Sequence, residues 1–195
     1  MKESHLRLAI PADAEALRAI YAPVVRDTVI SFEYEVPDSA EIARRVERTL
    51  AWAPWLVACD PTGHVLGYAY GGRYRERAAY DWIIETSVYI GADARRRGVG
   101  QQLYVALLAA LTLQGHRRAV AGVTLPNDPS VAFHESFGFE ACGVVQRAGW
   151  KHDAWHDVGF FERALGDELG APTPLRPAQE LYADPAFHAL LAAPS

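Results

Sequence analysis

The stretch Glu85-Thr-Ser-Val-Tyr-Ile-Gly-Ala-Asp-Ala-Arg-Arg-Arg-Gly-Val-Gly100 decides the fold. Its first half is rich in β-branched and aromatic residues, which predicts a strand, and a short polar turn follows. Beyond the turn, apolar residues recur every four positions, as on the buried face of an amphipathic helix: Val99, Leu103, Leu107 and Leu111. This stretch is therefore predicted to form a strand, a turn and a long helix.

The start of this helix is predicted to bind an anion. The first amide N–H groups of a helix have no acceptor within it, and the helix dipole adds positive charge there. Gly98 and Gly100 leave room for a ligand to reach the backbone, and three arginines lie just upstream. Together these features describe a pocket for a pyrophosphate, although a capped surface helix with a basic first turn remains the alternative.

Two common phosphate-binding motifs do not fit this stretch. A dinucleotide-binding fold requires a third glycine where this chain has Leu103, and an acidic residue after the next strand. The chain instead continues there into Leu125-Pro126-Asn127-Asp128, which is typical of a turn. The P-loop of nucleotide triphosphatases requires Gly-Lys-Ser or Gly-Lys-Thr, and the sequence contains neither.

Length and composition predict a soluble globular protein of one domain. Half of the 195 residues are hydrophobic and 22% are charged. With 19 basic and 24 acidic residues, the net charge is −5, so no broad basic surface is expected for nucleic acid or an acidic membrane. Two cysteines are too few for a disulfide scaffold or a closed zinc site. No signal peptide or long apolar run is visible, so we expect a cytoplasmic protein.

Strands and helices are predicted to alternate through most of the chain. Expected strands cover residues 5–10, 55–59, 64–74, 80–90, 118–124, 139–150 and 158–165. One helix is expected after Pro11 and another after Asp38, where Asp38 and Glu41 form a capping box. Two more are expected over 99–111 and 129–137. This order predicts an α/β sandwich around a mixed sheet. After residue 165, three prolines interrupt the pattern, and we expect a tail over 166–195 with one short helix near 181–191.

Glu85 is a candidate general base. A carboxylate in the middle of a strongly apolar strand is costly to bury, and partial burial raises its pKa. Such a carboxylate could take the proton from an ammonium group before the amine attacks a thioester. The alternative is a glutamate that faces solvent or forms a salt bridge.

A second group of polar residues follows the strand near 118–124. Pro129 suits the first turn of a helix capped by Asn127 or Asp128. In that helix Ser130 and His134 share one face. Asn127 could hold an extended ligand, and His134 could serve a leaving thiolate as acid, base or positioning group, or could be structural.

These motifs resemble those of two nested families. Arg95-x-x-Gly98-x-Gly100 resembles the acyl-CoA signature of the Gcn5-related N-acetyltransferases (GNAT). More specifically, three segments resemble the phosphinothricin acetyltransferases, a group that includes methionine sulfoximine and sulfone acetyltransferases. They are Arg77-x-x-Tyr80-Asp81-Trp82, Leu125-Pro126-Asn127-Asp128-Pro129-Ser130-Val131 and Trp150-Lys151-His152-x-x-Trp155-His156-Asp157-Val158-Gly159-Phe160. The resemblance covers about residues 5–165 and excludes the tail.

The resemblance implies a GNAT fold, with a mixed, mostly antiparallel sheet flanked by helices, over residues 1–165. It also implies acetyl transfer from acetyl-CoA to the α-amine of a small amino acid with a tetrahedral polar side chain. Glu85 and His134 would be catalytic. The residues implied to bind acetyl-CoA are Val88, Tyr89, Ile90, Arg95, Arg96, Arg97, Gly98, Val99, Gly100, Gln101, Asn127 and Ser130. Those implied for the substrate are Phe32, Glu33, Arg73, Arg75, Tyr80 and Thr86.

The implied substrate carries a carboxylate and a polar head, which favours recognition by a guanidinium group. Arg73 and Arg75 could supply it, although both could instead lie in a solvated loop. Lys151, His152 and His156 do not match the spacing of a closed zinc site, so no metal is expected and we expect them to shape the cavity or a dimer contact. The aromatic C-terminal strand suggests a homodimer.

Three rival mechanisms or functions remain at this point. An acetyl-cysteine intermediate on Cys142 is disfavoured, because that residue lies on a strand where a buried, inert thiol is expected. The enzyme could act on another amine, such as an ordinary amino acid, a peptide N-terminus or a polyamine, although a polyamine favours an acidic cavity. A non-catalytic acyl-CoA-binding module would not need both Glu85 and His134.

Overall fold

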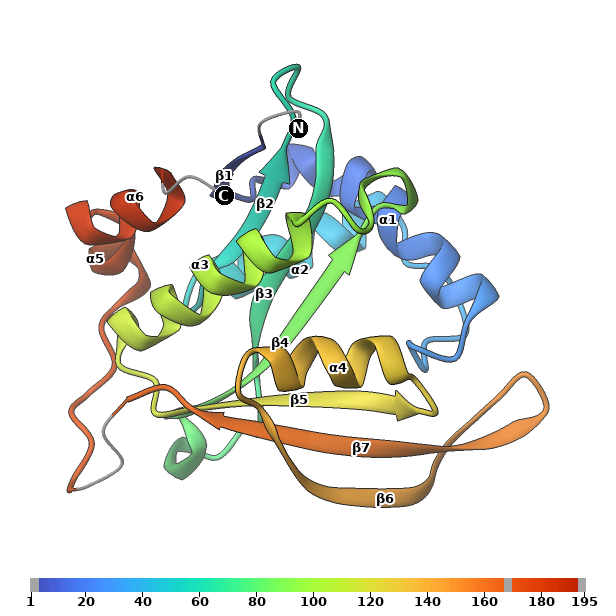
Figure 1. Cartoon of the computed structure of the whole chain (residues 1–195). Coiled ribbons are helices and arrows are strands. Elements are labelled where there is room, and N and C mark those ends of the chain that lie inside the picture. Colours follow the sequence, from blue (N-terminus) through green and yellow to red (C-terminus); the bar gives the residue numbers. More distant parts are fainter. Residues whose placement is uncertain (1–3, 167–169, 193–195) are drawn as a thin grey trace.

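The computed structural model describes residues 4–166 and 170–192. Within them, one seven-stranded sheet with the order β1-β2-β3-β4-β5-β7-β6 forms the centre of the molecule (Figure 1). Neighbouring strands are antiparallel except β4 and β5, which are parallel. The expected mixed, mostly antiparallel sheet flanked by helices is confirmed.

The elements follow the expected order closely. The strands are β1 (His5–Leu8), β2 (Trp55–Cys59), β3 (Val65–Arg73), β4 (Ile83–Ile90), β5 (Arg118–Leu125), β6 (Glu140–Lys151) and β7 (Ala154–Ala164). The α-helices are α1 (Ala14–Asp27), α2 (Ser39–Leu50), α3 (Val99–Gln114), α4 (Asp128–Ser136), α5 (Ala178–Tyr182) and α6 (Pro185–Ala192). Three short 3₁₀ helices are η1 (Pro11–Asp13), η2 (Ala78–Tyr80) and η3 (Ala92–Ala94).

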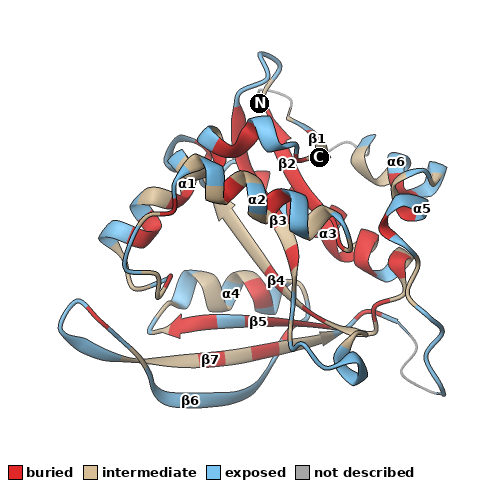
Figure 2. Cartoon of the chain, turned by 180° about the vertical axis from the view of Figure 1, so that it is seen from behind, coloured by how far each residue is buried: buried red, intermediate tan, exposed pale blue. Residues whose placement is uncertain are grey.

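Helices cover both faces of the sheet (Figures 1 and 2). Helices α1 and α2 pack on one face, in a cluster with Val57 and Tyr68. Helix α3 packs on the other face, where Leu103, Leu107 and Leu111 are fully buried. Each such leucine contributes about 1.5–3 kcal/mol by leaving water, so the four-residue repeat accounts for the position of α3 against the sheet.

The structure departs from two local expectations. Residues 80–82 do not begin β4, because the chain is still reversing from β3 there: the Asp81 N–H bonds to the Ala78 carbonyl within the η2 turn. The capping box of α2 is only half formed. Asp38 accepts a hydrogen bond from the Glu41 N–H at 2.7 Å, but the Glu41 carboxylate pairs with Arg44 and Arg45.

The C-terminal segment forms two helices where one was expected. Asp184 separates them, and its carboxylate accepts a hydrogen bond from the Ala186 N–H at 2.7 Å. Leu181 and Phe187 are fully buried in the same core as α3, so this segment packs on the body. The Tyr182 hydroxyl also donates to the Ala53 carbonyl at 2.8 Å. The division at residue 165 stays a prediction, and residues 167–169 and 193–195 of the expected tail lie outside the described residues.

No helix in the described ranges is both long and apolar enough to cross a membrane.

Candidate active site

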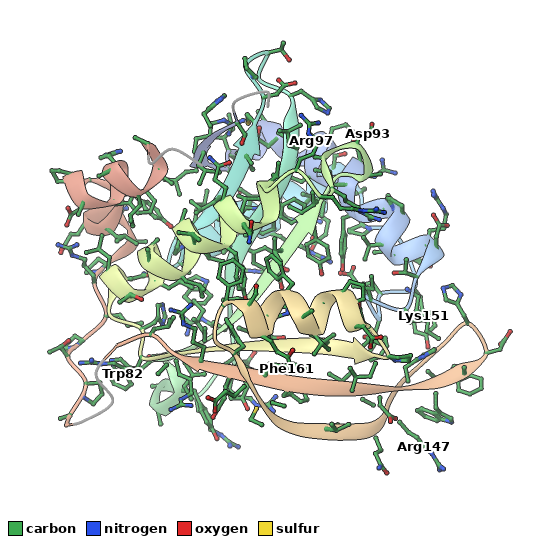
Figure 3. The ribbon with its side chains drawn as sticks, viewed as in Figure 1. Trp82, Asp93, Arg97, Arg147, Lys151 and Phe161 are labelled. Carbon is green, nitrogen blue, oxygen red and sulfur yellow. The ribbon has the colours of Figure 1, made fainter. Side chains whose placement is uncertain are left out.

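The loop between β4 and α3 presents backbone amides and positive charge. Gly98 caps α3 with a left-handed φ of 81°, a conformation that glycine adopts without strain. The first intrahelical bond runs from the Gln102 N–H to the Gly98 carbonyl, so the N–H groups of residues 99–101 precede it. Arg95, Arg96 and Arg97 are exposed, and Arg97 folds back onto the Asp93 carbonyl at 3.2 Å (Figure 3). This is the geometry of an anion site at a helix start.

The parallel strands β4 and β5 separate after a short paired region. Their register joins Ile83 to Arg118 and ends where Glu85 meets Val120. The rest of β4, including Val88, Tyr89 and Ile90, has no partner on the β5 side, and the two ribbons diverge in Figure 1. Backbone N–H and C=O groups along this opening are therefore available to an extended ligand. Gly100 lies at its upper end, where an added Cβ would be 3.6 Å from Ile90.

Glu85 is half-buried at the point where the two strands separate. Burial raises the pKa of its carboxyl, and the nearby positive charge of Arg75 offsets part of that rise. Within the described residues, no hydrogen bond or ion pair holds the carboxylate, which leaves it free to accept a proton. A raised pKa and free oxygens are what a general base for an ammonium group requires.

Gly122 makes room for the Glu85 carboxylate, and the sequence analysis did not identify it. A Cβ at this position on β5 would lie 3.7 Å from Glu85 Oε1 and 3.6 Å from Phe160. Because glycine has no side chain, the sheet surface beside the carboxylate stays open. A glycine inside an otherwise apolar strand marks such a close approach, and this signal was present in the sequence.

Thr86 lies on the opposite face of β4 from Glu85. It is buried, and its hydroxyl shares a 2.7 Å hydrogen bond with the Tyr104 hydroxyl of α3. Because successive strand residues point to opposite faces, Thr86 cannot line the same cavity as Glu85. The structure therefore does not bring this predicted substrate residue to the other candidates.

His134 is buried among aromatic rings on the α3 and α4 side. The rings of Tyr104, Phe133, Phe139 and Phe161 surround it, with centroids 5.4–6.5 Å away. Its Nδ1 lies 2.7 Å from the Ser130 carbonyl, which can only accept, so Nδ1 carries the proton. Burial lowers the pKa of the ring, so His134 is neutral near pH 7 and its Nε2 holds a lone pair.

Asn127 and Ser130 begin α4 as expected. The Asn127 side-chain oxygen accepts the Ser130 N–H at 3.3 Å, which caps the helix. Because this bond uses the side-chain oxygen of Asn127, the NH₂ group of the same side chain can still donate hydrogen bonds. Whether these two residues contact a cofactor stays a prediction, as does the same role for Gln101, which is exposed on the first turn of α3.

Two cavities lie near Glu85 and share Trp52 and Arg73 in their linings, although Glu85 itself lines neither. The larger, about 630 Å³, lies between α2 and the face of β3, and Glu33, Arg45, Tyr70 and Gly72 are among its lining residues. Gly72 is paired in register with Glu85, so this cavity borders the catalytic candidate. The smaller, about 280 Å³, is lined by the predicted substrate residues Arg73, Arg75 and Tyr80, among others.

The loop between α1 and α2 is fastened across the larger cavity. Glu33 accepts hydrogen bonds from Tyr21 at 2.8 Å and from Arg45 at 2.8 and 3.1 Å. Phe32 packs on β6 at Gly149, where an added Cβ would be 2.4 Å from the ring. Glu33 therefore lines the cavity, where it is already neutralised by Arg45, whereas Phe32 packs against the β6–β7 hairpin.

Lys151 holds the α1–α2 loop in place. The sequence predicted that it would shape the cavity or a dimer contact, but not that it would bind this loop. Its side chain is 3% exposed, and Nζ donates to the carbonyls of Val25 at 2.6 Å and Ser31 at 2.7 Å. His156 in turn bonds to the Lys151 carbonyl at 2.9 Å. Figure 3 places Lys151 at the end of the β6–β7 hairpin, beside the α1–α2 loop. The hairpin and the loop thus form one wall, which sequence spacing alone could not indicate.

The expectation that Cys142 is buried is wrong. Its thiol is exposed on the edge strand β6, where a buried thiol was expected. An edge strand has one side without a neighbour, and β6 is exposed along most of its length. The pKa of the thiol is nevertheless raised, by partial desolvation and by the charge of Glu162, which is the opposite of what a nucleophilic cysteine requires.

Among the residues that the structure describes, no three histidine, cysteine or acidic side chains gather in a way that could hold a metal ion.

Comparisons with known proteins place the chain in a family. The acetyltransferase (GNAT) domain family matches residues 6–159. The chain is 40% identical to the phosphinothricin N-acetyltransferase of Streptomyces viridochromogenes over 90% of its own length and 95% of that protein. It is 33% identical to the L-methionine sulfoximine/L-methionine sulfone acetyltransferase of Pseudomonas paraeruginosa, over 86% of this chain and 98% of that one.

Solved structures agree with these relatives. The phosphinothricin acetyltransferase of Sinorhizobium meliloti, solved in complex with acetyl-CoA, superposes with a TM-score of 0.84 at 34% identity. The match covers 91% of this chain and 97% of the Sinorhizobium chain. The sheet that separates between β4 and β5, the glycine-capped helix and the matched domain together show that this chain belongs to the GNAT acetyltransferase family.

Proposed function

We propose that this enzyme transfers acetyl from acetyl-CoA to the α-amine of a small amino acid with a tetrahedral polar head. Phosphinothricin, methionine sulfoximine and methionine sulfone are of this type. The half-buried, unpaired carboxylate of Glu85 at the opening between β4 and β5 carries the proposal. Relatives named for these substrates support it, at 33–40% identity over most of the chain. Acetylation of phosphinothricin would appear as herbicide resistance.

The residues present fit acetyl-CoA as the cosubstrate. The N–H groups of Val99, Gly100 and Gln101 and the charges of Arg95–Arg97 would hold its pyrophosphate. The unpaired backbone of β4 beyond Glu85 would bind the extended arm, with Asn127 beside it, and would polarise the carbonyl of the thioester. Acetyl-CoA supplies an acetyl group activated by its bond to sulfur.

The reaction proceeds by direct attack in a ternary complex. Glu85 removes one proton from the ammonium group, and the amine nitrogen then bonds to the acetyl carbon. As the carbon–sulfur bond breaks, the nitrogen loses its second extra proton, which passes to the leaving sulfur, so that CoA is released as a thiol. The raised pKa of the Cys142 thiol supports this route over an acetyl-cysteine intermediate. Of the roles left open for His134, positioning is favoured, because its neutral ring holds α4 to the aromatic cluster around Tyr104.

The substrate would bind on the Glu85 side of the sheet. Arg73 and Arg75 supply guanidinium groups there, while Phe32 and Tyr80 supply aromatic surface. An arginine-rich lining favours an anionic substrate over a polyamine. Thr86 is not part of this surface.

We also infer a homodimer that works in the cytoplasm. Val144, Val145, Trp150 and Trp155 are 43–58% exposed along the β6–β7 hairpin, which is a large apolar surface for a monomer to leave in water. The two cysteines are free, as is usual in a reducing compartment. Sedimentation at micromolar concentration would test the dimer, and a monomer would contradict it.

An assay of thiol release tests the function directly. Acetyl-CoA is offered with phosphinothricin, methionine sulfoximine, methionine sulfone, lysine and spermidine in parallel. We expect release of free CoA with the first three at far higher kcat/KM than with the last two. Turnover of spermidine alone would favour a different amine, and binding of acetyl-CoA without turnover of any amine would indicate a non-catalytic module.

A further inference from the structure

The C-terminal segment closes one side of the smaller cavity, which we call the tail pocket. Its body wall includes Arg75, Tyr80 and Ile83, and its other wall includes Arg176 and Gln179. The GNAT domain match ends at residue 159, so this second wall lies outside the family domain. At about 280 Å³ the pocket is just below the usual size range of small-molecule sites, which suits a binding site for part of a ligand.

The tail pocket adjoins the larger cavity and lies near Glu85. Trp52 and Arg73 line both the tail pocket and the larger cavity, and the Arg73 guanidinium lies 4.7 Å from the Trp52 ring centroid. Ile83 precedes Glu85 by two residues on the same face of β4, a separation of about 7 Å along a strand. Arg75 is close enough for its charge to lower the pKa of Glu85.

The lining of the tail pocket is positively charged. It contains three arginines and one carboxylate, that of Asp81. Arg73 pairs with Asp81 at 3.2 Å, and Arg176 pairs with Asp184 at 2.6 Å. Within residues 4–166 and 170–192 no ion pair or hydrogen bond holds Arg75, whose guanidinium lies 4.9 Å from the Tyr74 ring centroid. A guanidinium stacked on a ring keeps its N–H edge free for two hydrogen bonds to an oxoanion.

We propose that the tail pocket binds the anionic head of the substrate, with Arg75 as its partner, and that the C-terminal segment sets the preference for anionic over neutral heads. This inference rests on the proposed function. Four single bonds join the amine nitrogen of phosphinothricin to its phosphorus, a span of roughly 5 Å. An amine held at Glu85 therefore brings the phosphinate to the edge of the pocket near Ile83.

Introducing a charged residue in place of Gln179 tests the proposal without removing any predicted catalytic or substrate residue. Gln179 is exposed on α5 at the pocket wall, so Gln179→Glu and Gln179→Lys should both fold, which a melting curve checks. For each variant, kcat/KM is measured with phosphinothricin, whose head is anionic, and with methionine sulfone, whose head is neutral. We expect the phosphinothricin/sulfone ratio to fall about threefold in Gln179→Glu and to rise about threefold in Gln179→Lys, through KM.

Glu180→Gln is the matched control. It changes the net charge by the same amount as Gln179→Lys, one residue away, and Glu180 is exposed and does not line the pocket. The ratio should stay at the wild-type value in this variant. A ratio that does not change at position 179, or that changes equally at 180, would overturn the proposal. If the wild-type enzyme acetylates neither compound, the proposed function itself fails, which is a distinct result.

Discussion

The two sides of the active site differ in how the chain builds them. The proposed cofactor side comes mainly from one continuous stretch, residues 85–101, with a glycine cap and exposed arginines, and Asn127 at the start of α4 adds to it. The proposed substrate side gathers residues from distant segments: Phe32 from the α1–α2 loop, Arg75 from the exit of β3, Lys151 from the β6–β7 hairpin and Gln179 from the C-terminal segment.

This difference has a physical cause. A helix start needs only local features to bind phosphate, because its unpaired N–H groups and its dipole arise from the backbone itself. A substrate cavity needs walls that only tertiary packing can bring together, such as Lys151 against the Val25 and Ser31 carbonyls. A substitution on one side should therefore change KM for one cosubstrate and leave KM for the other unaffected. Glu85 is the exception, because the two proposed sides meet there.

The largest effect is expected at that meeting point. Glu85→Gln keeps the shape of the side chain but removes the proton acceptor, so turnover should fall about 10²- to 10⁴-fold while the affinity for acetyl-CoA changes little. Because burial raises the pKa of Glu85, wild-type kcat/KM should fall as pH drops through that raised pKa, where the carboxylate becomes protonated. Steady-state kinetics from pH 5 to 9 measures both.

Glu162→Gln is the matched control for this experiment. Glu162 is also a half-buried strand glutamate, but it is paired with Arg118 at 2.7 Å. Its variant should retain turnover close to that of the wild type. Equal turnover in wild type and Glu85→Gln at neutral pH would exclude Glu85 as the base.

A smaller effect, confined to the amine, is expected at Gly149. Gly149→Ala places a Cβ 2.4–2.7 Å from the ring of Phe32, a proposed substrate residue, so the ring must move away from β6. We expect KM for the amine to rise about tenfold and KM for acetyl-CoA to stay the same, because misplaced positioning groups weaken only the substrate they hold. Gly143→Ala on the same strand is the control, since nothing lies within 4 Å of its added Cβ. If KM for the amine is the same in Gly149→Ala and Gly143→Ala, Phe32 does not take part in substrate binding.

The smallest of these three effects is expected at Gly98 and should be confined to acetyl-CoA. Gly98→Ala adds a Cβ where the pyrophosphate is proposed to bind, and KM for acetyl-CoA should rise about fivefold with little change in KM for the amine. Gly63→Ala is the control, because Gly63 has a similar left-handed φ of 87° and nothing within 4 Å of its added Cβ. Both variants carry the same backbone strain of about 1–2 kcal/mol, so a melting curve should show similar losses of stability. A KM for acetyl-CoA that rises equally in both would contradict the assignment of the loop.

The sequence alone predicted the order of strands and helices, because periodicity of apolar residues is a local signal. The repeat from Val99 to Leu111 indicated which face of α3 would be buried, and Gly98 indicated where that helix begins. Glu85 could be identified as unusual for the same reason, since a carboxylate in an apolar strand is visible without a fold. Family membership also followed from motifs that are short and continuous.

Tertiary structure decided which of these side chains share a cavity. Strand alternation placed Thr86 on the face opposite Glu85, and the edge position of β6 exposed Cys142. The C-terminal helices joined the main core through Phe187 and Leu181, and so made one wall of the tail pocket. These outcomes depend on contacts between residues far apart in the chain, and a local pattern carries no information about which distant side chains will pack against it.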